Sequence, residues 1–249
     1  MSENRRVLVD MVLGARADAV WAALREPDQI ERWFGWDYDG LAAEIRQIFV
    51  DDVEADQQAG SLAFPDGDRI VLDPQGDDRT GLRVLRNEHP AGYVGEYDPI
   101  DEGWITFTQQ LRFGLERHRG QARRTVSALG VGLGPQDDPL LARLGIRLLG
   151  DEPVGSRYTV DRADGTQFGG EIFFQTDLQL GLTVEQEGDD LLVIARTPPS
   201  SAPPDGAAMF VLSTYGQDDA GHAATEERWT GWWGNADVTP AQRQVPSHS

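Results

Sequence analysis

The hydrophobic and polar positions of residues 98–120, DPIDEGWITFTQQLRFGLERHRG, recur with the period of an amphipathic helix. Its predicted apolar face consists of residues at helical spacing: Trp104, Phe107, Thr108, Leu111 and Leu115. Asp98 can cap the first N–H groups, Pro99 suits the first helical position, and Gly120 can end the helix. About twenty residues make a helix roughly 30 Å long. A helix of this length with one apolar face needs a sheet to pack against.

The chain before this helix supplies candidate strands. The pattern predicts a strand over residues 5–14, followed by two short helices over 18–26 and 28–34 that Pro27 separates. Further strands are expected between Gly-, Pro- and Asp-rich turns, over residues 41–52, 61–64, 68–72 and 81–86. This order predicts an α+β layer in which the long helix covers one face of an antiparallel sheet.

Two motifs in this half resemble a known family. Residues 15–35, ARADAVWAALREPDQIERWFG, resemble the opening of the helix-grip (SRPBCC) superfamily, which includes START, Bet v 1-like and polyketide cyclase proteins. More narrowly, they resemble the branch related to the activator of Hsp90 ATPase, and so does the helix start EGWITFTQQL at 102–111. The positions that fit the branch's first motif are Val20, Trp21, Ala23, Leu24, Pro27, Ile30, Trp33 and Phe34. The strands between the motifs look fewer and shorter than the family's usual set.

The second half of the chain resembles the first. Residues 123–126, RRTV, resemble residues 5–8, and Tyr215–Gly221 resembles Tyr97–Gly103 at the same offset. Its predicted elements are a short helix at 139–149, strands at 156–162, 171–176, 181–186, 191–197 and 209–214, and a terminal helix at 223–233. We therefore expect a helix-grip unit over 1–120, a degenerate second unit over 121–234 and a disordered tail over 235–249. Chance similarity of short Gly/Asp-rich stretches is the alternative.

Composition narrows the possible functions. The formal net charge of −20 disfavours nucleic acid and membrane surfaces as partners. The chain has no cysteine, which excludes disulfides and thiolate chemistry, and no lysine, which excludes Schiff-base chemistry. No metal or cofactor is expected, because His222 and Glu226 read best as a solvated helix start and residues 130–135, GVGLGP, fail the dinucleotide fingerprint. Without an apolar leader, the protein is expected to be cytoplasmic.

The resemblance implies a cavity between the long helix and the sheet that takes lipids, polyketides or other apolar ligands. Carried over by position, its lining would be Trp36, Tyr38, Phe49, Phe64, Trp104, Phe107, Thr108 and Leu111. Arg46 is the candidate polar contact, because a charge on an otherwise apolar strand must be solvated or paired. His89 and Tyr97 are further candidates. The alternative is that the same aromatic side chains fill a core without a cavity.

Three functions follow from this sequence. The first is a non-enzymatic module that binds a hydrophobic small molecule, since no catalytic signature is present. The second is a cyclase- or dehydratase-type enzyme using the same cavity, with Arg46, His89 and Tyr97 as its proton-transfer candidates. The third is a chaperone-cofactor or regulatory module with a protein partner, which rests on family analogy. The sequence allows a monomer or a homodimer.

Overall fold

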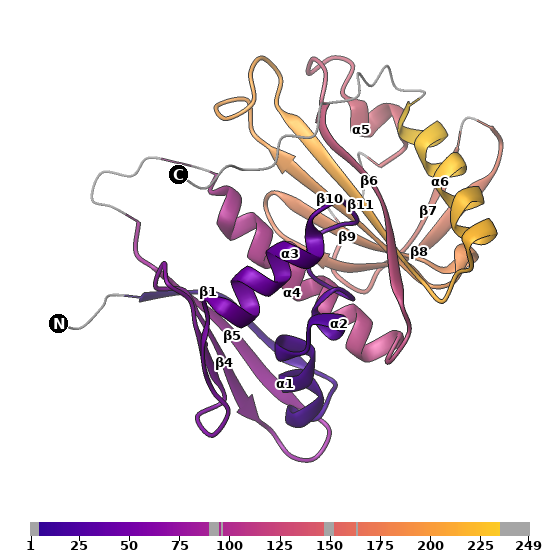
Figure 1. The fold of residues 1–249 in the computed structure, drawn as a ribbon. Helices are drawn as coiled ribbons and strands as arrows, with labels where there is room; N and C mark the ends of the chain where they lie inside the picture. Colours follow the sequence, from indigo (N-terminus) through magenta and orange to yellow (C-terminus); the bar gives the residue numbers. More distant parts are fainter. Residues whose placement is uncertain (1–4, 90–94, 96, 147–151, 163, 235–249) are drawn as a thin grey trace. The chain divides into compact units, whose positions relative to one another are not determined.

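The computed structural model describes residues 5–89, 95, 97–146, 152–162 and 164–234 (Figure 1). The chain forms two compact units, Met1–Arg123 and Arg124–Ser249. Each unit contains an antiparallel sheet followed by a long helix, so the predicted α+β helix-grip tandem is confirmed. The expected tail over 235–249 lies outside the described residues. Among those described, no helix combines the length and apolar character needed to cross a bilayer.

The first unit is a five-stranded sheet with helices on one face. The strand order is β1-β5-β4-β3-β2, and all neighbours are antiparallel. Its elements are β1 (Arg5–Leu13), α1 (Ala17–Arg25), α2 (Pro27–Ile30), α3 (Leu41–Arg46), the π-helix η1 (Gln47–Asp51), β2 (Glu54–Asp56), β3 (Ser61–Ala63), β4 (Arg69–Pro74), β5 (Thr80–Asn87) and α4 (Pro99–Arg117). The predicted strands at 5–14, 61–64, 68–72 and 81–86 are confirmed as β1, β3, β4 and β5.

The predicted strand over residues 41–52 is wrong, because this segment forms the helices α3 and η1. Its buried side chains are Leu41, Ile45 and Phe49, each four residues after the last, so one helical face and not one strand face is buried. The pattern around Ile48 resembles the alternation of a strand because apolar side chains also occur outside the buried helical face. The segment therefore contributes a helical layer above the sheet.

The helix α4 begins and ends as its sequence predicts. The Asp98 carboxylate accepts hydrogen bonds from the backbone N–H groups of Ile100 at 2.9 Å and Asp101 at 3.3 Å. Pro99 is the first helical residue, and Gly120 follows the helix with a φ of 80°. Because four N–H groups at a helix start lack partners within the helix, the Asp98 cap fixes where α4 begins.

A buried ion network joins the first turn of α4 to the sheet. Arg86 on β5 donates to Asp68 at 2.9 Å and to Asp101 at 2.6 Å, and Arg6 on β1 donates to Asp101 at 2.7 Å. Trp104 Nε1 donates to Asp68 at 3.0 Å. Burial raises the pKa of Asp68, and the hydrogen bond from Arg86 opposes that shift. Five buried or half-buried groups therefore pair with one another across β1, β5, α4 and the turn before β4, which fixes the position of α4 on this sheet.

The second unit is a six-stranded antiparallel sheet with the order β6-β11-β10-β9-β8-β7. Its elements are β6 (Arg123–Gly132), α5 (Leu140–Arg143), β7 (Arg157–Asp161), β8 (Gln167–Gln175), β9 (Gln179–Val184), the 3₁₀ turn η3 (Glu185–Glu187), β10 (Asp190–Thr197), β11 (Ala207–Tyr215) and α6 (Asp219–Gly234). The five strands predicted between 156 and 214 and the terminal helix are confirmed. The predicted short helix is shorter than expected, with its residues 147–149 outside the described part.

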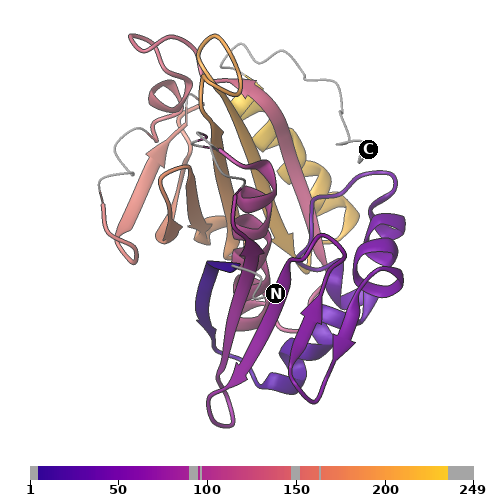
Figure 2. The same ribbon diagram turned by 90° about the vertical axis from the view of Figure 1, so that its left-hand side faces the viewer.

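The core of this unit is formed by tryptophans of α6 on one face of the sheet. Figure 2 shows α6 in yellow lying along the strands. The ring centroids of Trp229 and Trp232 lie 5.0 Å from that of Phe168, and Trp233 stacks on Phe210 at 5.6 Å. Such ring pairs bury large areas and add edge-to-face or stacking energy to the hydrophobic effect. The three tryptophans therefore fill the space between α6 and the sheet.

We predict that Asp98→Ala lowers the free energy of unfolding by about 1 kcal/mol at pH 7, because α4 loses its cap. Burial raises the pKa of Asp98, but hydrogen bonds from the N–H groups of Asp101 and Ile100 outweigh it and lower the pKa overall. A lowered folded-state pKa means that the carboxylate stabilises the fold at neutral pH and loses this effect as pH falls below about 4. Urea unfolding followed by tryptophan fluorescence between pH 7 and pH 3 measures both effects.

The control is Asp98→Asn, which keeps an acceptor oxygen at the cap position. It should lose less stability at pH 7 than Asp98→Ala and should show little of the acid dependence. Equal losses in the two variants would contradict the role of the Asp98 side chain as a helix cap.

Candidate functional site

The aromatic residues of the first unit pack against one another beneath α4. The ring centroids of Phe49 and Phe64 lie 5.7 Å apart, those of Phe64 and Trp104 5.3 Å apart, and those of Phe34 and Phe107 4.8 Å apart. Phe49 is fully buried, and Phe64 and Trp104 are each 8% exposed. These rings are therefore part of the hydrophobic core of the first unit.

Three other predicted lining residues, Thr108, Leu111 and Tyr38, contact neighbouring parts of the first unit. The Thr108 hydroxyl lies 2.7 Å from the backbone oxygen of Trp104 in the preceding turn, and Leu111 is 2% exposed within the core. Tyr38 donates its hydroxyl to the Glu44 carboxylate, and burial together with this bond raises the pKa of Tyr38. These side chains support the helices of the first unit.

Trp36, Arg46 and Tyr97 lie apart from the centre of the aromatic core. Trp36 is half-buried, with its ring centroid 6.5 Å from that of Phe107. Arg46 lies on helix α3 and not on a strand, its side chain is 73% exposed, and its Nε lies 3.4 Å from a carboxylate oxygen of Asp51. Tyr97 is half-buried just before α4. Arg46 is therefore solvated, because the segment that carries it is helical and turns the side chain outward.

His89 lies beside two carboxylates at the start of α4. Its Nδ1 is 3.8 Å from Asp98 Oδ2 and its Nε2 is 3.7 Å from Asp101 Oδ2. These three residues could in principle hold a metal ion. However, guanidinium groups of Arg86 and Arg6 already contact Asp101 at 2.6 Å and 2.7 Å. Because a cation would be repelled by both guanidinium groups, we assign the cluster to the attachment of α4 to the sheet.

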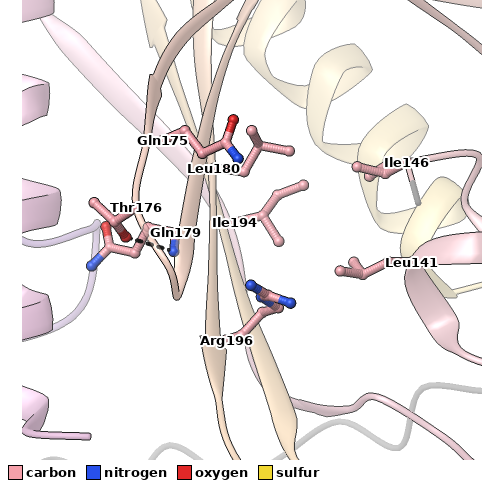
Figure 3. Close-up of a pocket in the computed structure, with 8 residues that line it drawn as sticks. All are labelled: Leu141, Ile146, Gln175, Thr176, Gln179, Leu180, Ile194 and Arg196. Carbon is pink, nitrogen blue, oxygen red and sulfur yellow. Dashed lines mark hydrogen bonds between the residues drawn. The ribbon is translucent and has the colours of Figure 1, made fainter. Parts of the chain in front are cut away.

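A pocket lies in the second unit, between the segment around α5 and the strands β8, β9 and β10 (Figure 3). One wall comes from the α5 side and the other from the sheet, and the close-up shows Leu141 and Ile146 facing Leu180, Ile194 and Arg196. The complete lining is Leu141, Ile146, Gln175, Thr176, Gln179, Leu180, Ile194 and Arg196. The pocket therefore has an apolar wall of branched side chains and a polar rim.

The polar rim is fixed by the turn between β8 and β9. Thr176 Oγ1 accepts hydrogen bonds from the backbone N–H groups of Leu178 at 3.3 Å and Gln179 at 2.9 Å. The backbone N–H of Arg196 donates to Leu178 O at 2.8 Å, and its guanidinium Nη2 donates to Asp177 O. Because backbone groups hold both Thr176 and Arg196, the rim is preorganised without a ligand.

The sequence pattern does not predict this pocket. Leu141 and Ile146 belong to an apolar run that reads as an ordinary packing helix, and the second unit lacks the first motif of the family. One signal was available in Arg196, which follows the apolar run of residues 191–195 on strand β10. A charge directly after a buried strand segment marks a place where the sheet meets solvent or a polar ligand.

Comparison with known proteins gives structural likeness alone. No family model matches the chain, and no curated protein matches it. Two similar solved structures are the di-domain ARO/CYC proteins BexL of the BE-7585A pathway (12% identity, 97% of this chain and 100% of that chain, TM-score 0.34) and StfQ of the steffimycin pathway (10%, 94% and 95%, 0.33). DynU16, from the dynemicin biosynthetic locus, has 16% identity over 93% of this chain and 95% of its own, with a TM-score of 0.28. At these scores the likeness carries no argument about the site.

We predict that Phe49→Ala lowers the free energy of unfolding by about 3–5 kcal/mol, because a buried ring in a close-packed cluster leaves a cavity when it is removed. Ile48→Ala, in the same π-helix but half-buried, is the matched control and should cost clearly less, since less apolar area is lost. Urea unfolding curves of the three proteins give the comparison. A loss below about 1 kcal/mol for Phe49→Ala would indicate that the ring lines open space and not a core.

Proposed function

We propose that this protein is a small-molecule-binding module whose ligand occupies the pocket of the second unit. The observation that carries the proposal is the pocket itself, an open space of about 90 Å3 in which Ile146 and Ile194, at 2% and 1% exposure, form an apolar floor below a polar rim. Sites for small molecules commonly combine an apolar lining with a few fixed polar groups. In the first unit the aromatic side chains beneath α4 pack on one another, so the role of that unit in this proposal is structural.

The position of the pocket supports the binding function. In the second unit, the tryptophans of α6 fill one part of the helix-covered face of the sheet, and the pocket lies on the part beneath α5. Leu180 and Ile194 belong to both the core and the pocket. A ligand would therefore extend the hydrophobic core and remove apolar surface from water, which stabilises a complex by roughly 25 cal/mol per Å2 before the costs of association.

We expect Leu141→Trp to block the pocket, because Leu141 is half-buried in its wall and a larger ring can fill the space without disturbing the strands. The probe is 2-naphthol, an aromatic alcohol, and its binding is measured by isothermal titration calorimetry. The variant should weaken binding by about tenfold or more, which corresponds to about 1.4 kcal/mol. The matched control is Val154→Trp, at a residue 58% exposed in the same unit and outside the pocket lining.

The control should bind the probe within about twofold of the unmodified protein. If both variants bind 2-naphthol as the unmodified protein does, the ligand does not use this pocket. Circular dichroism and unfolding curves of each variant separate loss of binding from loss of folding.

A second candidate is an enzyme of the cyclase or dehydratase type that uses the same pocket. BexL and StfQ, two of the similar solved structures, are named di-domain ARO/CYC proteins. The observation that favours it here is the guanidinium of Arg196 beside the hydroxyl of Thr176 in the lining. Such groups can orient the carbonyl oxygens of a flexible chain and stabilise an enolate as it forms.

Conversion of a linear poly-β-ketone thioester distinguishes the two candidates. If the protein is an enzyme, cyclised product should form faster than in buffer, and Leu141→Trp should reduce the rate to that of buffer while Val154→Trp should not. If it is a binding module, the substrate should bind and remain unconverted. Product formation is followed by liquid chromatography with mass detection. A rate increase that survives in Leu141→Trp would contradict a reaction in this pocket.

The resemblance to the branch related to the activator of Hsp90 ATPase remains a proposal that rests on the motifs at 15–35 and 102–111. In the structure, most apolar positions of the first motif pack in the core. Trp33 is 2% exposed and its Nε1 donates to the backbone oxygen of Ala23 at 2.8 Å, which ties the turn after α2 to α1. The burial of these residues gives no support to a protein-binding function, so we rank the chaperone-cofactor or regulatory role third.

A further inference from the structure

The rim of the pocket in the second unit presents hydrogen-bond donors and a positive charge. Among the described residues that line it, Arg196 is the one that carries a charge, and no carboxylate or imidazole belongs to this lining. An ammonium or other cationic ligand would therefore find no counter-ion in the lining. A ligand with an anionic oxygen would meet a guanidinium group that can donate several N–H bonds in one plane.

Arg196 differs from other exposed arginines of the same unit. Arg143 pairs with Asp138 at 3.0 Å, and Arg157 pairs with Glu185 at 2.7 Å and with Glu171 at 4.0 Å. The guanidinium of Arg196 has a backbone carbonyl, that of Asp177, as its one partner among the described residues. The chain carries 42 acidic and 22 basic residues, so carboxylates are abundant. A guanidinium whose charge is not neutralised by any described carboxylate is therefore a notable feature of this pocket.

Thr176 adds a second donor to the rim. Its Oγ1 accepts hydrogen bonds from two backbone N–H groups, those of Leu178 and Gln179. A hydroxyl oxygen has two lone pairs and one proton, so both acceptor sites are used and the proton remains to be donated. Thr176 and Arg196 together therefore favour a ligand that accepts hydrogen bonds.

We infer that the pocket selects an amphipathic anion, with an aromatic or other flat apolar body and a carboxylate or enolate oxygen. The apolar body would contact Ile146 and Ile194, and the anionic oxygen would accept from Arg196, the specificity-determining residue. This inference rests on the proposed binding function and names the chemical class of its ligand. Hydrogen bonds between a guanidinium and an anionic oxygen are stronger than those between neutral groups, which gives the preference for the anion.

The test compares two probes of nearly equal shape, 2-naphthoate and 2-naphthamide, by isothermal titration calorimetry at pH 7. The unmodified protein should bind 2-naphthoate about tenfold more tightly than 2-naphthamide, the size expected from one charge-assisted hydrogen bond. Arg196→Met keeps an apolar stem of similar length and should remove this preference while binding of the amide stays within about twofold. Arg196→Lys keeps the charge and should retain part of the preference.

Arg157→Met is the matched control, because it removes an exposed arginine of the same unit that lies outside the pocket lining. It should keep the tenfold preference, which excludes a general effect of net charge. Equal affinity of the unmodified protein for both probes would overturn the inference and leave the pocket proposal standing. The same holds if Arg196→Met keeps the preference. If neither probe binds the unmodified protein, the proposed binding function fails and the inference fails with it.

Discussion

The packing of a long aromatic helix on an antiparallel sheet is the interaction on which each unit of this protein depends. In the first unit, Trp104 of α4 meets Phe49 and Phe64, and a buried ion network of Asp68, Arg86 and Asp101 fixes the first turn of the helix. Burying charges is costly unless they are paired and hydrogen-bonded, and here the carboxylates share two guanidinium groups and an indole N–H. The network therefore fixes one position of the helix on the sheet.

The second unit meets the same requirement with different side chains. Trp229, Trp232 and Trp233 fill the space below α6, and Leu140 and Leu144, in and next to α5, pack on the same core. In the first unit the corresponding cover includes α1, α2 and α3, with Phe34 and Phe49 beneath them. Leu141 of α5 and Ile146 after it form one wall of the pocket, and Leu180 and Ile194 of β9 and β10 form the other.

The features that local pattern determines could be predicted from the sequence. Asp98, Pro99 and Gly120 mark α4 because capping chemistry depends on residues close in sequence. Residues 41–52 could not be assigned correctly, since the buried positions Leu41, Ile45 and Phe49 are separated by other apolar residues that imitate alternation. The site was the least predictable part. Whether aromatic side chains fill a cavity or line it depends on how they pack in three dimensions, and the pocket brings together residues from 141 to 196.

The net charge of the chain affects how an anionic ligand would reach Arg196, the charged residue of the pocket lining. A protein with a net charge of −20 repels anions at long range, so an anionic ligand gains nothing from general attraction and must be held by local contacts. Arg196 provides such a contact at the rim, where the backbone carbonyl of Asp177 holds its guanidinium in place without neutralising it. The net negative charge repels an anion at long range, and Arg196 attracts it only locally. The pocket therefore favours an anionic ligand that also has an apolar body in contact with Ile146 and Ile194. Affinity in this pocket would then require both parts of an amphipathic anion together.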